Sequence, residues 1–581
     1  MNTKSKHSSG FINAHTHIFT KDHVPEHLAR QFVPGPVYKW LKTSKVISKL
    51  KKYYEPPEGH YSYTQRNKRW STYQNRIEIK RNPILKYGLL LIKILTWVAF
   101  VYYFLQAIKP LFIQTIAGKI IYGYVLVPFD YITYPIESTW NILVLLFIIA
   151  LTFKFVRNGL WKMLKSRFIK IVGKDRLEYL LRFENLLRYA NYNSQGGIFS
   201  KLTQQYPPNT QFVVLPMDME YMDADIVPVS YLKQMDELIA LKNISKNKDV
   251  LLPFVFVDPR RIEKQTEIDP FFKYDDSSPD EIKLENCRLK TYLDDGACGI
   301  KIYPALGYYP FDKKLLPLWL YCAQNEIPIT THCSVGPIFY RGDKKVEWDR
   351  HPIFEEVISN DENGQPKPPE KLRLQQIRNI DFQANFTHPL NYTCLLIPEY
   401  LKSLLELEEY QHLQLLFGYS KEGLKRDLSN LKINLAHYGG SENWDEFLAK
   451  DREQEANEIF NNPTVGLNLK KDLLNLTNLY RHWHYTEWFS LISSMIIEFD
   501  NVYTDISYTT HENKYLNLLS EILNNPEIKD RVLFGTDFYV VSNQKTEKQY
   551  WIDMKNMMGD EKWNSISYKN PKRFLYHKVF K

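Results

Sequence analysis

The sequence predicts an α/β chain folded as a (β/α)8 barrel, with a long helical insertion between the first and second strands. Eight short apolar runs alternate with longer stretches of helical character, and a hydrophobic segment interrupts the first connection. Strands that alternate with helices form parallel βαβ units, and eight such units close into a barrel. The runs cover residues 11–18, 211–217, 250–257, 298–303, 327–332, 431–437, 501–506 and 531–536.

The predicted barrel domain comprises residues 11–19 and 200–581, and the insertion comprises residues 20–199. Within the insertion, residues 87–108 and 138–156 form two apolar runs, expected as a helical hairpin. A helix as long as the first run rises about 33 Å, which is enough to cross a bilayer. The alternative is a pair of buried helices in a soluble lobe.

Charge and topology favour two transmembrane spans. Lysine and arginine cluster before the first apolar run and after the second, with only Lys109 and Lys119 between them. Such an asymmetry places both flanks in the cytoplasm. The strands on either side of the insertion must join one sheet, which requires an even number of spans. We therefore expect an inner (cytoplasmic) membrane protein whose catalytic domain lies in the cytoplasm.

The composition is that of a globular protein. Hydrophobic residues make up 44% of the chain and charged residues 24%, which excludes a disordered chain. The net charge of +9 is concentrated beside the hydrophobic insertion, which favours anionic lipid over nucleic acid. Five cysteines without a Cys-x-x-Cys pair indicate reduced thiols. The expected partners are a small-molecule substrate and the lipid bilayer, with no nucleic acid; the oligomeric state stays open.

Several predicted strands end in a residue that can bind a metal ion. The first carries His15 and His17, and residues two apart on a strand point to the same face. The fifth ends in His332, the sixth in His437, and the eighth in Asp537. Active sites of (β/α)8 barrels lie at the C-terminal ends of the strands, where these side chains would converge. The pattern therefore predicts a metal site.

Three motifs resemble the TIM-barrel amidohydrolase superfamily, in the amidohydrolase-related branch that also contains decarboxylase-like enzymes. Asn-Ala-His-Thr-His, Leu-Ala-His-Tyr-Gly-Gly and Leu-Phe-Gly-Thr-Asp look like that family's signatures on strands one, six and eight. The segment His-Pro-Leu-Asn-Tyr at 388–392 is similar to one between strands five and six. The resemblance covers residues 11–18 and roughly 211–540, and the chain departs from it over 20–200.

The resemblance implies a ligand set. His15, His17, His332 and Asp537 would hold a divalent ion, and Zn²⁺ suits imidazole and carboxylate ligands best. Such an ion lowers the pKa of water to about 7. Asp537 would also carry a proton to the leaving group, and His437 would orient the water, polarise the substrate or bind a second ion.

Lys301 bears on whether the site takes one ion or two. Lys-Ile-Tyr-Pro-Ala is similar to the dihydroorotase segment in which a carboxylated lysine bridges two metals. A carbamylated Lys301 would join His332 and His437 around a second ion, whereas an unmodified Lys301 would pair with a substrate carboxylate or a neighbouring aspartate. We favour one ion and leave two open.

The remaining polar residues near strand ends have two interpretations each. Asp505, after the seventh strand, would orient a metal-binding histidine or serve as a helix cap or salt bridge. The same alternatives apply to Asp218 after the second strand. Core packing is expected for His482, Trp483, His484 and Trp488, with pocket lining as the alternative. Loop positions are expected for His351 and His388.

The predicted function is hydrolysis of a C–N or C–O bond by metal-activated water. The same site would serve non-oxidative decarboxylation of a small organic acid, with Lys301 or Arg341 holding the carboxylate. A membrane scaffold with a catalytically relict barrel is the alternative outside catalysis. No motif identifies the substrate.

Overall fold

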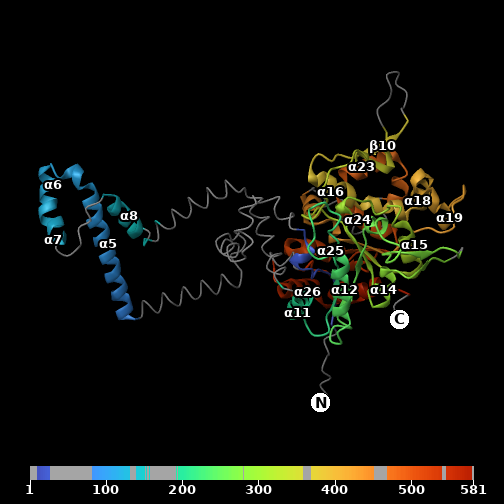
Figure 1. Cartoon of the computed structure of the whole chain (residues 1–581), viewed down its shortest axis with the longest axis horizontal. Coiled ribbons are helices and arrows are strands. Elements are labelled where there is room, and N and C mark those ends of the chain that lie inside the picture. Colours follow the sequence, from blue (N-terminus) through green and yellow to red (C-terminus); the bar gives the residue numbers. More distant parts are fainter. Residues whose placement is uncertain are drawn as a thin grey trace, which may run out of the picture. The chain divides into compact units, whose positions relative to one another are not determined.

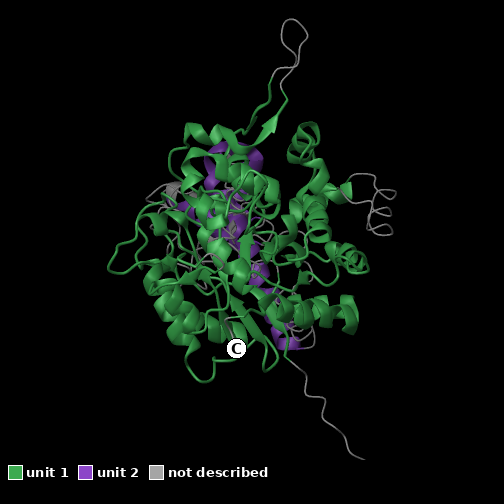
Figure 2. Cartoon of the chain, turned by 90° about the vertical axis from the view of Figure 1, so that its right-hand side faces the viewer, with its two compact units in different colours: residues 1–44, 182–581 green, residues 45–181 purple. Residues whose placement is uncertain are grey.

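In the computed structural model the chain forms two compact units, one of residues 1–44 and 182–581 and one of residues 45–181 (Figure 2). The described residues are 10–25, 82–130, 139–150, 152–153, 156, 192, 194–278, 281–357, 368–449, 468–538 and 545–578. The second unit, 45–181, lies inside the predicted insertion of residues 20–199, whose boundaries remain a prediction.

Every one of the eight predicted apolar runs contains a parallel strand, and the third run contains two. The α/β class and the parallel arrangement are therefore confirmed. Neighbours in space follow the order of the chain. The strands are β1 (Ile12–Thr16), β2 (Gln211–Val214), β3 (Leu251–Pro253), β4 (Val255–Phe256), β7 (Ile300–Ile302), β8 (Ile329–His332), β11 (Ile433–Ala436), β12 (Val502–Asp505) and β13 (Val532–Leu533).

The expected single closed barrel is not formed as one continuous ladder. The strands make a three-stranded sheet, β1-β2-β3, and a six-stranded sheet, β13-β12-β11-β8-β7-β4. The break falls within one run of chain, because β3 pairs with β2 and β4 pairs with β7. Pro253 lies at this break and has no amide hydrogen to donate to a ladder. The difference from the prediction is thus local to the third run and to the edge between β1 and β13.

Hydrogen bonds nevertheless connect β1 to the chain that follows β13. The Ala14 amide donates to the Phe534 carbonyl at 2.8 Å, and the His17 amide donates to the Phe538 carbonyl at 2.9 Å. A small buried cluster also gathers side chains from both sheets: Ile12, Ala14, Val213, Leu215, Phe254, Cys298, Tyr503 and Leu533, with Phe574. Residues of the first and last strands therefore share one core.

Helices connect the strands and lie around them (Figure 1). Each buries an apolar face, as α25 does with Tyr515, Leu519 and Ile522. The principal helices of this unit are α11 (Gln195–Thr203), α12 (Tyr231–Lys242), α13 (Pro259–Glu263), α14 (Arg288–Asp294), α15 (Leu316–Asn325), α16 (Asn379–Thr387), α17 (Thr393–Leu396), α18 (Pro398–Glu406), α19 (Gln414–Phe417), α20 (Ser441–Ala449), α22 (Leu469–Asp472), α23 (Leu476–Tyr485), α24 (Trp488–Glu498), α25 (Lys514–Ile522), α26 (Glu547–Asn564) and α27 (Asn570–Leu575).

Two antiparallel pairs decorate the connections. β5 (Tyr274–Asp275) pairs with β6 (Lys283–Leu284), and β9 (Arg350–Glu356) pairs with β10 (Glu370–Arg373). The second pair follows β8 and extends from the unit at the end labelled β10 in Figure 1.

The second unit contains one helix long and apolar enough to cross a membrane. This helix, α5 (Pro83–Phe112), begins after the Asn82 side chain, which accepts hydrogen bonds from the amides of Ile84 and Leu85. Its apolar stretch, Pro83–Leu111, contains the predicted span 87–108 and is almost entirely exposed. Thirty residues of helix rise about 45 Å, more than the hydrocarbon thickness of a bilayer.

The second predicted span corresponds in part to α8 (Thr139–Ala150), which packs against α5. Its 12 described residues are too few to cross a bilayer by themselves, and most of the rest of 138–156 lies outside the described residues. The hairpin of two spans therefore remains a prediction. Two further helices, α6 (Ile116–Ile121) and α7 (Val127–Asp130), lie between α5 and α8 in the chain.

Candidate metal centre

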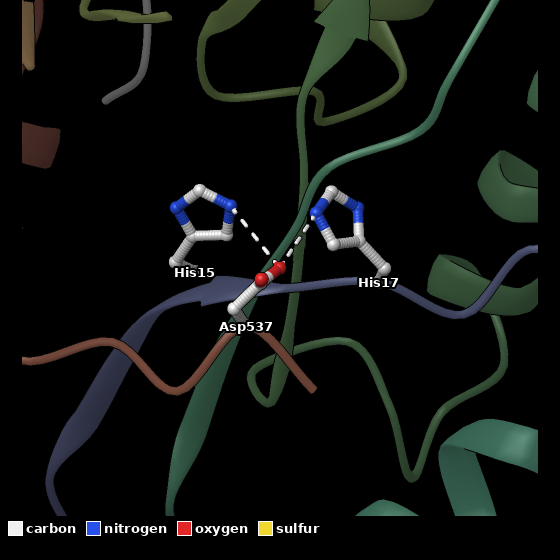
Figure 3. A group of neighbouring side chains, drawn as sticks. All are labelled: His15, His17 and Asp537. Carbon is white, nitrogen blue, oxygen red and sulfur yellow. Dashed lines mark ion pairs between the residues drawn. The ribbon is translucent and has the colours of Figure 1, made fainter. Parts of the chain in front are cut away.

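Three of the four predicted metal ligands converge in the structure. His17 Nε2 lies 3.2 Å from Asp537 Oδ1, and His15 Nε2 lies 3.8 Å from the same oxygen. Figure 3 shows the two imidazoles on either side of the Asp537 carboxylate, each with one ring nitrogen directed at it. All three residues are buried, and one ligand atom from each lies within 4.8 Å of the others. This spacing suits coordination of one cation.

The irregular register of β1 turns His15 toward this centre. Ile12 and Ala14 pack in the small core cluster with Tyr503, and Asp505 follows Tyr503 on the same face of β12. Strict alternation would turn His15 away from that face. The pairing of β1 with β2 shifts between Asn13 and Thr16, however, and His15 does contact Asp505. A bulge of this kind re-aims a side chain.

Hydrogen bonds place a proton on Nδ1 of His15, in β1, and of His17, just after it. His17 Nδ1 lies 2.7 Å from the Leu215 carbonyl oxygen, which can only accept, so Nδ1 carries a proton. In the neutral ring, His17 Nε2 then presents a lone pair to the Asp537 carboxylate. Two acceptors facing each other at 3.2 Å repel unless a proton or a cation lies between them.

His15 repeats this arrangement. Its Nδ1 lies 3.0 Å from Asp505 Oδ2, so the ring donates from Nδ1. Burial lowers the pKa of His15 to about 4, against the opposing effect of Asp505, and the ring is therefore neutral at pH 7. Its Nε2 is buried and has no hydrogen-bond partner among the described residues. An orphaned imidazole lone pair beside a carboxylate is a fitting ligand for a divalent cation.

Asp505 organises the floor of the centre. Its Oδ2 accepts from His15 Nδ1 and, at 2.7 Å, from Asn434 Nδ2. Its Oδ1 accepts from the amides of His437 and Ser507, at 3.2 and 3.1 Å, and from the Ser507 hydroxyl. Burial alone would raise the pKa of Asp505, but the adjacent histidines and these donors hold it far below its usual value. Asp505 is thus an ionised group that orients a histidine, and it caps no helix.

His332 and His437 form a pair next to the cluster. His437 Nδ1 lies 3.2 Å from the Ser507 carbonyl oxygen, so Nδ1 carries the proton and Nε2 accepts. His332 Nδ1 then donates to His437 Nε2 across 3.0 Å. His437, together with His15 and Asp505, forms a second group of potential ligands, whereas His332 belongs to neither group. His332 stacks on Tyr303 with ring centroids 4.1 Å apart.

Lys301 lies buried in the same region. Burial lowers the pKa of its amine to about 8, and the negative charges of Asp505 and Asp537 act in the opposite direction. A lowered pKa leaves a larger fraction of the amine unprotonated, which is the form that carbamylation requires. The cationic form would instead pair with a carboxylate, so both alternatives for Lys301 stay open.

Backbone strain is concentrated at the centre. His437, Tyr438 and Asp537 all have positive φ, at 74°, 46° and 55°. Non-glycine residues rarely adopt this conformation, and such residues cluster at functional sites. The preceding Gly535 allows the close approach of β1, because a Cβ there would lie 2.7 Å from His15 Cβ.

Other residues singled out in the sequence lie outside the cluster. Asp218 accepts from Arg261 Nε at 2.6 Å in a buried ion pair, which is the salt-bridge alternative. The Arg341 guanidinium lies over the Phe339 ring. The expected loop position of His351 was wrong, because this residue lies in β9 and bonds Asn391 through Nε2 at 3.0 Å.

Four of the aromatic and histidine residues singled out in the sequence are buried in the core: His388, His482, Trp483 and Trp488. His388, which follows α16, stacks on Trp483 with ring centroids 3.9 Å apart. Trp488 is buried, and His482 lies 3.5 Å from Asp472.

The sequence interpretation missed Asn434 and Ser507, the partners of Asp505. Both are buried polar residues, Asn434 inside β11 and Ser507 just after β12, and a buried polar side chain requires a hydrogen-bond partner. That signal was visible, although the identity of the partner was not.

No protein-family model matches the chain, and no curated protein matches it. Among solved structures, it is similar to an uncharacterised TIM-barrel protein from Bordetella bronchiseptica, with 11% identity and a TM-score of 0.28 over 65% of this chain and 82% of that one. It is also similar to an amidohydrolase from Mycobacterium avium subsp. paratuberculosis, with 13% identity and a TM-score of 0.27 over 66% and 75% of the two chains. At scores this low, neither likeness bears on what this chain does.

Proposed function

We propose that the protein is a metal-dependent hydrolase of the amidohydrolase-related type, acting on a C–N or C–O bond, with its centre at the C-terminal ends of the parallel strands. The observation that carries the proposal is the convergence of His15 Nε2 and His17 Nε2 on the buried Asp537 carboxylate, with His15 Nε2 buried and without a hydrogen-bond partner among the described residues. Without a cation or a proton between them, these groups would face each other as acceptors in a low-dielectric interior.

The donor set fits a divalent ion, and Zn²⁺ matches imidazole and carboxylate ligands best. His15, His17 and Asp537 would hold it, with His332 or His437 completing the set. Such an ion would act as a Lewis acid and lower the pKa of its bound water to about 7. One ion is proposed, and a second would use His437 and a carbamylated Lys301.

The side chains of the site have distinct tasks in this proposal. Burial would raise the pKa of Asp537, but the bond with His17 and the nearby imidazoles outweigh it and lower the pKa to about 2. Asp537 is therefore ionised and can accept a proton from the attacking water and deliver it to the leaving group. His437 orients the water or polarises the substrate, and Lys301 pairs with a negatively charged group of the substrate.

Decarboxylation of a small organic acid is the second candidate, favoured by the buried Lys301 amine beside the centre. A cationic amine in a low-dielectric site binds a carboxylate strongly. A panel of esters, amides, lactones and small unsaturated or aromatic acids would separate the two reactions. Carbon dioxide release without hydrolysis of any ester or amide would replace hydrolase with decarboxylase.

Metal analysis tests the proposal directly. We expect about one Zn²⁺ per chain in the purified protein, and loss of both metal and turnover in Asp537→Asn. Two ions per chain after purification with bicarbonate would instead support a carbamylated Lys301. A wild-type protein that binds no divalent metal would refute the proposal and revive the scaffold interpretation.

We infer that the second unit anchors the enzyme in the cytoplasmic membrane, with the catalytic unit in the cytoplasm. The support is the length of α5 and the exposure of its apolar side chains, such as Leu91, Ile92 and Leu95. Deletion of residues 84–156 is expected to move the protein from the membrane pellet to the supernatant. Retention of the deletion variant in the pellet would contradict the anchor.

A further inference from the structure

A buried acid lies outside the metal centre and has no task in the proposed reaction. Glu547 is the first residue of α26 and is 1% exposed. Its Oε2 accepts the hydroxyl hydrogen of Tyr206. Its Oε1 is buried without a hydrogen bond of good geometry among the described residues, with the Thr536 hydroxyl beside it. Burial of this carboxyl group therefore costs free energy of folding unless the group stabilises the surrounding structure.

Asn13 links this acid to the metal centre. Its Nδ2 donates to Tyr206 Oη and to Thr536 Oγ1, both at 2.9 Å. Its Oδ1 accepts from the amides of His15 and Thr536, both at 3.2 Å. Both amide hydrogens and both acceptor positions of the Asn13 carboxamide are therefore used, and these four hydrogen bonds fix its orientation.

The consequence is a fixed alignment of β1 with the chain around Asp537. The amides of Thr536 and Asp537 both reach the His15 carbonyl, at 3.3 and 2.9 Å. Asn13 reinforces this contact through side-chain bonds to the same two segments. This contact holds the backbone of His15 beside that of Asp537. Glu547 fixes the position of Tyr206, and Tyr206 accepts one of the two Asn13 donors.

The surroundings of Glu547 favour its neutral form. Burial raises its pKa to about 7, the hydrogen bonds from Tyr206 and Thr536 oppose this, and the charge of Asp537 adds to it. Tyr550, on the next turn of α26, also faces it. The nearby cation Lys545 is paired with Asp553 at 3.1 Å.

We propose that Glu547 is a positioning residue for the metal centre, acting through Tyr206 and Asn13 to hold His15 and Asp537 at ligand distance. This inference rests on the proposed function, because it requires a metal at that centre. Gln reproduces the size and neutrality of the protonated acid, whereas Ala removes the partner of Tyr206. The two substitutions therefore have different expected effects.

The test measures Zn²⁺ affinity of the full-length protein at pH 6.5 by competition with a chromophoric chelator. We compare the wild type with Glu547→Gln, Glu547→Ala and Tyr206→Phe, with Glu561→Ala on an exposed position of the same helix as the matched control. We expect Glu547→Gln and the control to lie within twofold of the wild type. Glu547→Ala and Tyr206→Phe should bind about tenfold more weakly, as substitutions behind metal ligands do.

Two further readouts separate positioning from general stability. Circular dichroism of the metal-free variants reports whether they are folded, and affinity is compared only among folded protein. At pH 8.5 the wild type gains a buried negative charge that Glu547→Gln lacks, so it should bind Zn²⁺ about threefold or more tightly than that variant.

The possible results have separate meanings. If folded Glu547→Ala and Tyr206→Phe bind Zn²⁺ as well as the wild type, the positioning role is wrong. If Glu547→Gln is as weak as Glu547→Ala, or if its affinity follows that of the wild type up to pH 8.5, the neutral acid is wrong. A wild type that binds no Zn²⁺ overturns the proposed function itself.

Discussion

Replacing Asp505 by Asn should reverse the tautomer of His15 and thereby weaken the metal site. The two carboxylate oxygens accept from five donors, namely His15 Nδ1, Asn434 Nδ2, the amides of His437 and Ser507, and the Ser507 hydroxyl. An amide NH2 in either orientation would face at least one donor. The ring of His15 can relieve this conflict by moving its proton from Nδ1 to Nε2, and the lone pair aimed at Asp537 is then lost.

The magnitude follows from what each group loses. A substitution behind a metal-binding histidine lowers affinity about 10- to 100-fold, which corresponds to about 1.4–2.7 kcal/mol. The loss of charge-assisted hydrogen bonds at a fully buried carboxylate should also lower the free energy of unfolding by about 2–4 kcal/mol. We expect the apoprotein to remain folded because its large buried core is untouched.

Zinc affinity by chelator competition at pH 7.5 and urea unfolding of the apoprotein measure the two effects separately. The matched control is Asp500→Asn, since the Asp500 side chain is 96% exposed and lies 3.7 Å from Arg531. The control should change neither quantity measurably. Zinc affinity of folded Asp505→Asn within twofold of the wild type would refute the reasoning about the His15 tautomer.

Three further predictions concern packing, protons and metal. Gly535→Ala should cost about 1–3 kcal/mol in urea unfolding, because the new Cβ would lie 2.7 Å from His15 Cβ and 3.1 Å from Ser507 Cβ; Gly88→Ala, in α5 with no described atom within 4 Å, should not destabilise the chain, because Ala favours a helix interior over Gly, and equal stability of the two variants would contradict the close contact. Burial lowers the pKa of His351 to about 3, so between pH 6.5 and 3 the unfolded chain binds one proton more than the folded chain. Stability should therefore fall on acidification by about 1.4 kcal/mol per pH unit from this residue, and His351→Gln should show a shallower fall between pH 6.5 and 5 than the wild type; identical slopes would argue against a neutral buried ring. Removing the metal with a chelator should lower stability by about 2.7 kcal/mol relative to protein held at one hundred times the Zn²⁺ dissociation constant, and calorimetry of Asp537→Asn should show no such difference.

Much of the scaffold was predictable because its signals are local. Each of the nine parallel strands lies inside one of the eight apolar runs, and a run of that length between helical stretches needs no distant information to be recognised. The division of the third run into β3 and β4 was not predicted. It depends on which neighbour each half of the run pairs with, and that choice is made by the whole sheet.

The ligand types were predictable in the same way, whereas their geometry was not. His15, His17 and Asp537 could be selected because strand ends of parallel α/β units meet at one edge. His332 lies outside that cluster and forms a hydrogen bond with His437 instead. This arrangement depends on side-chain packing, which spacing in the sequence does not encode.

The sequence by itself determined the parallel α/β class and the residues at the strand ends, and it predicted two membrane spans, of which α5 alone is long enough among the described residues. Only the tertiary structure decided how His15 is turned and protonated. The bulge in β1 aligns it with Asp505, the Leu215 carbonyl fixes the proton of His17, and Glu547 reaches the same centre through Tyr206 and Asn13. Periodicity records which face a residue occupies within its own segment, but a register shift and a hydrogen-bond partner from a distant strand arise only when the segments pack together.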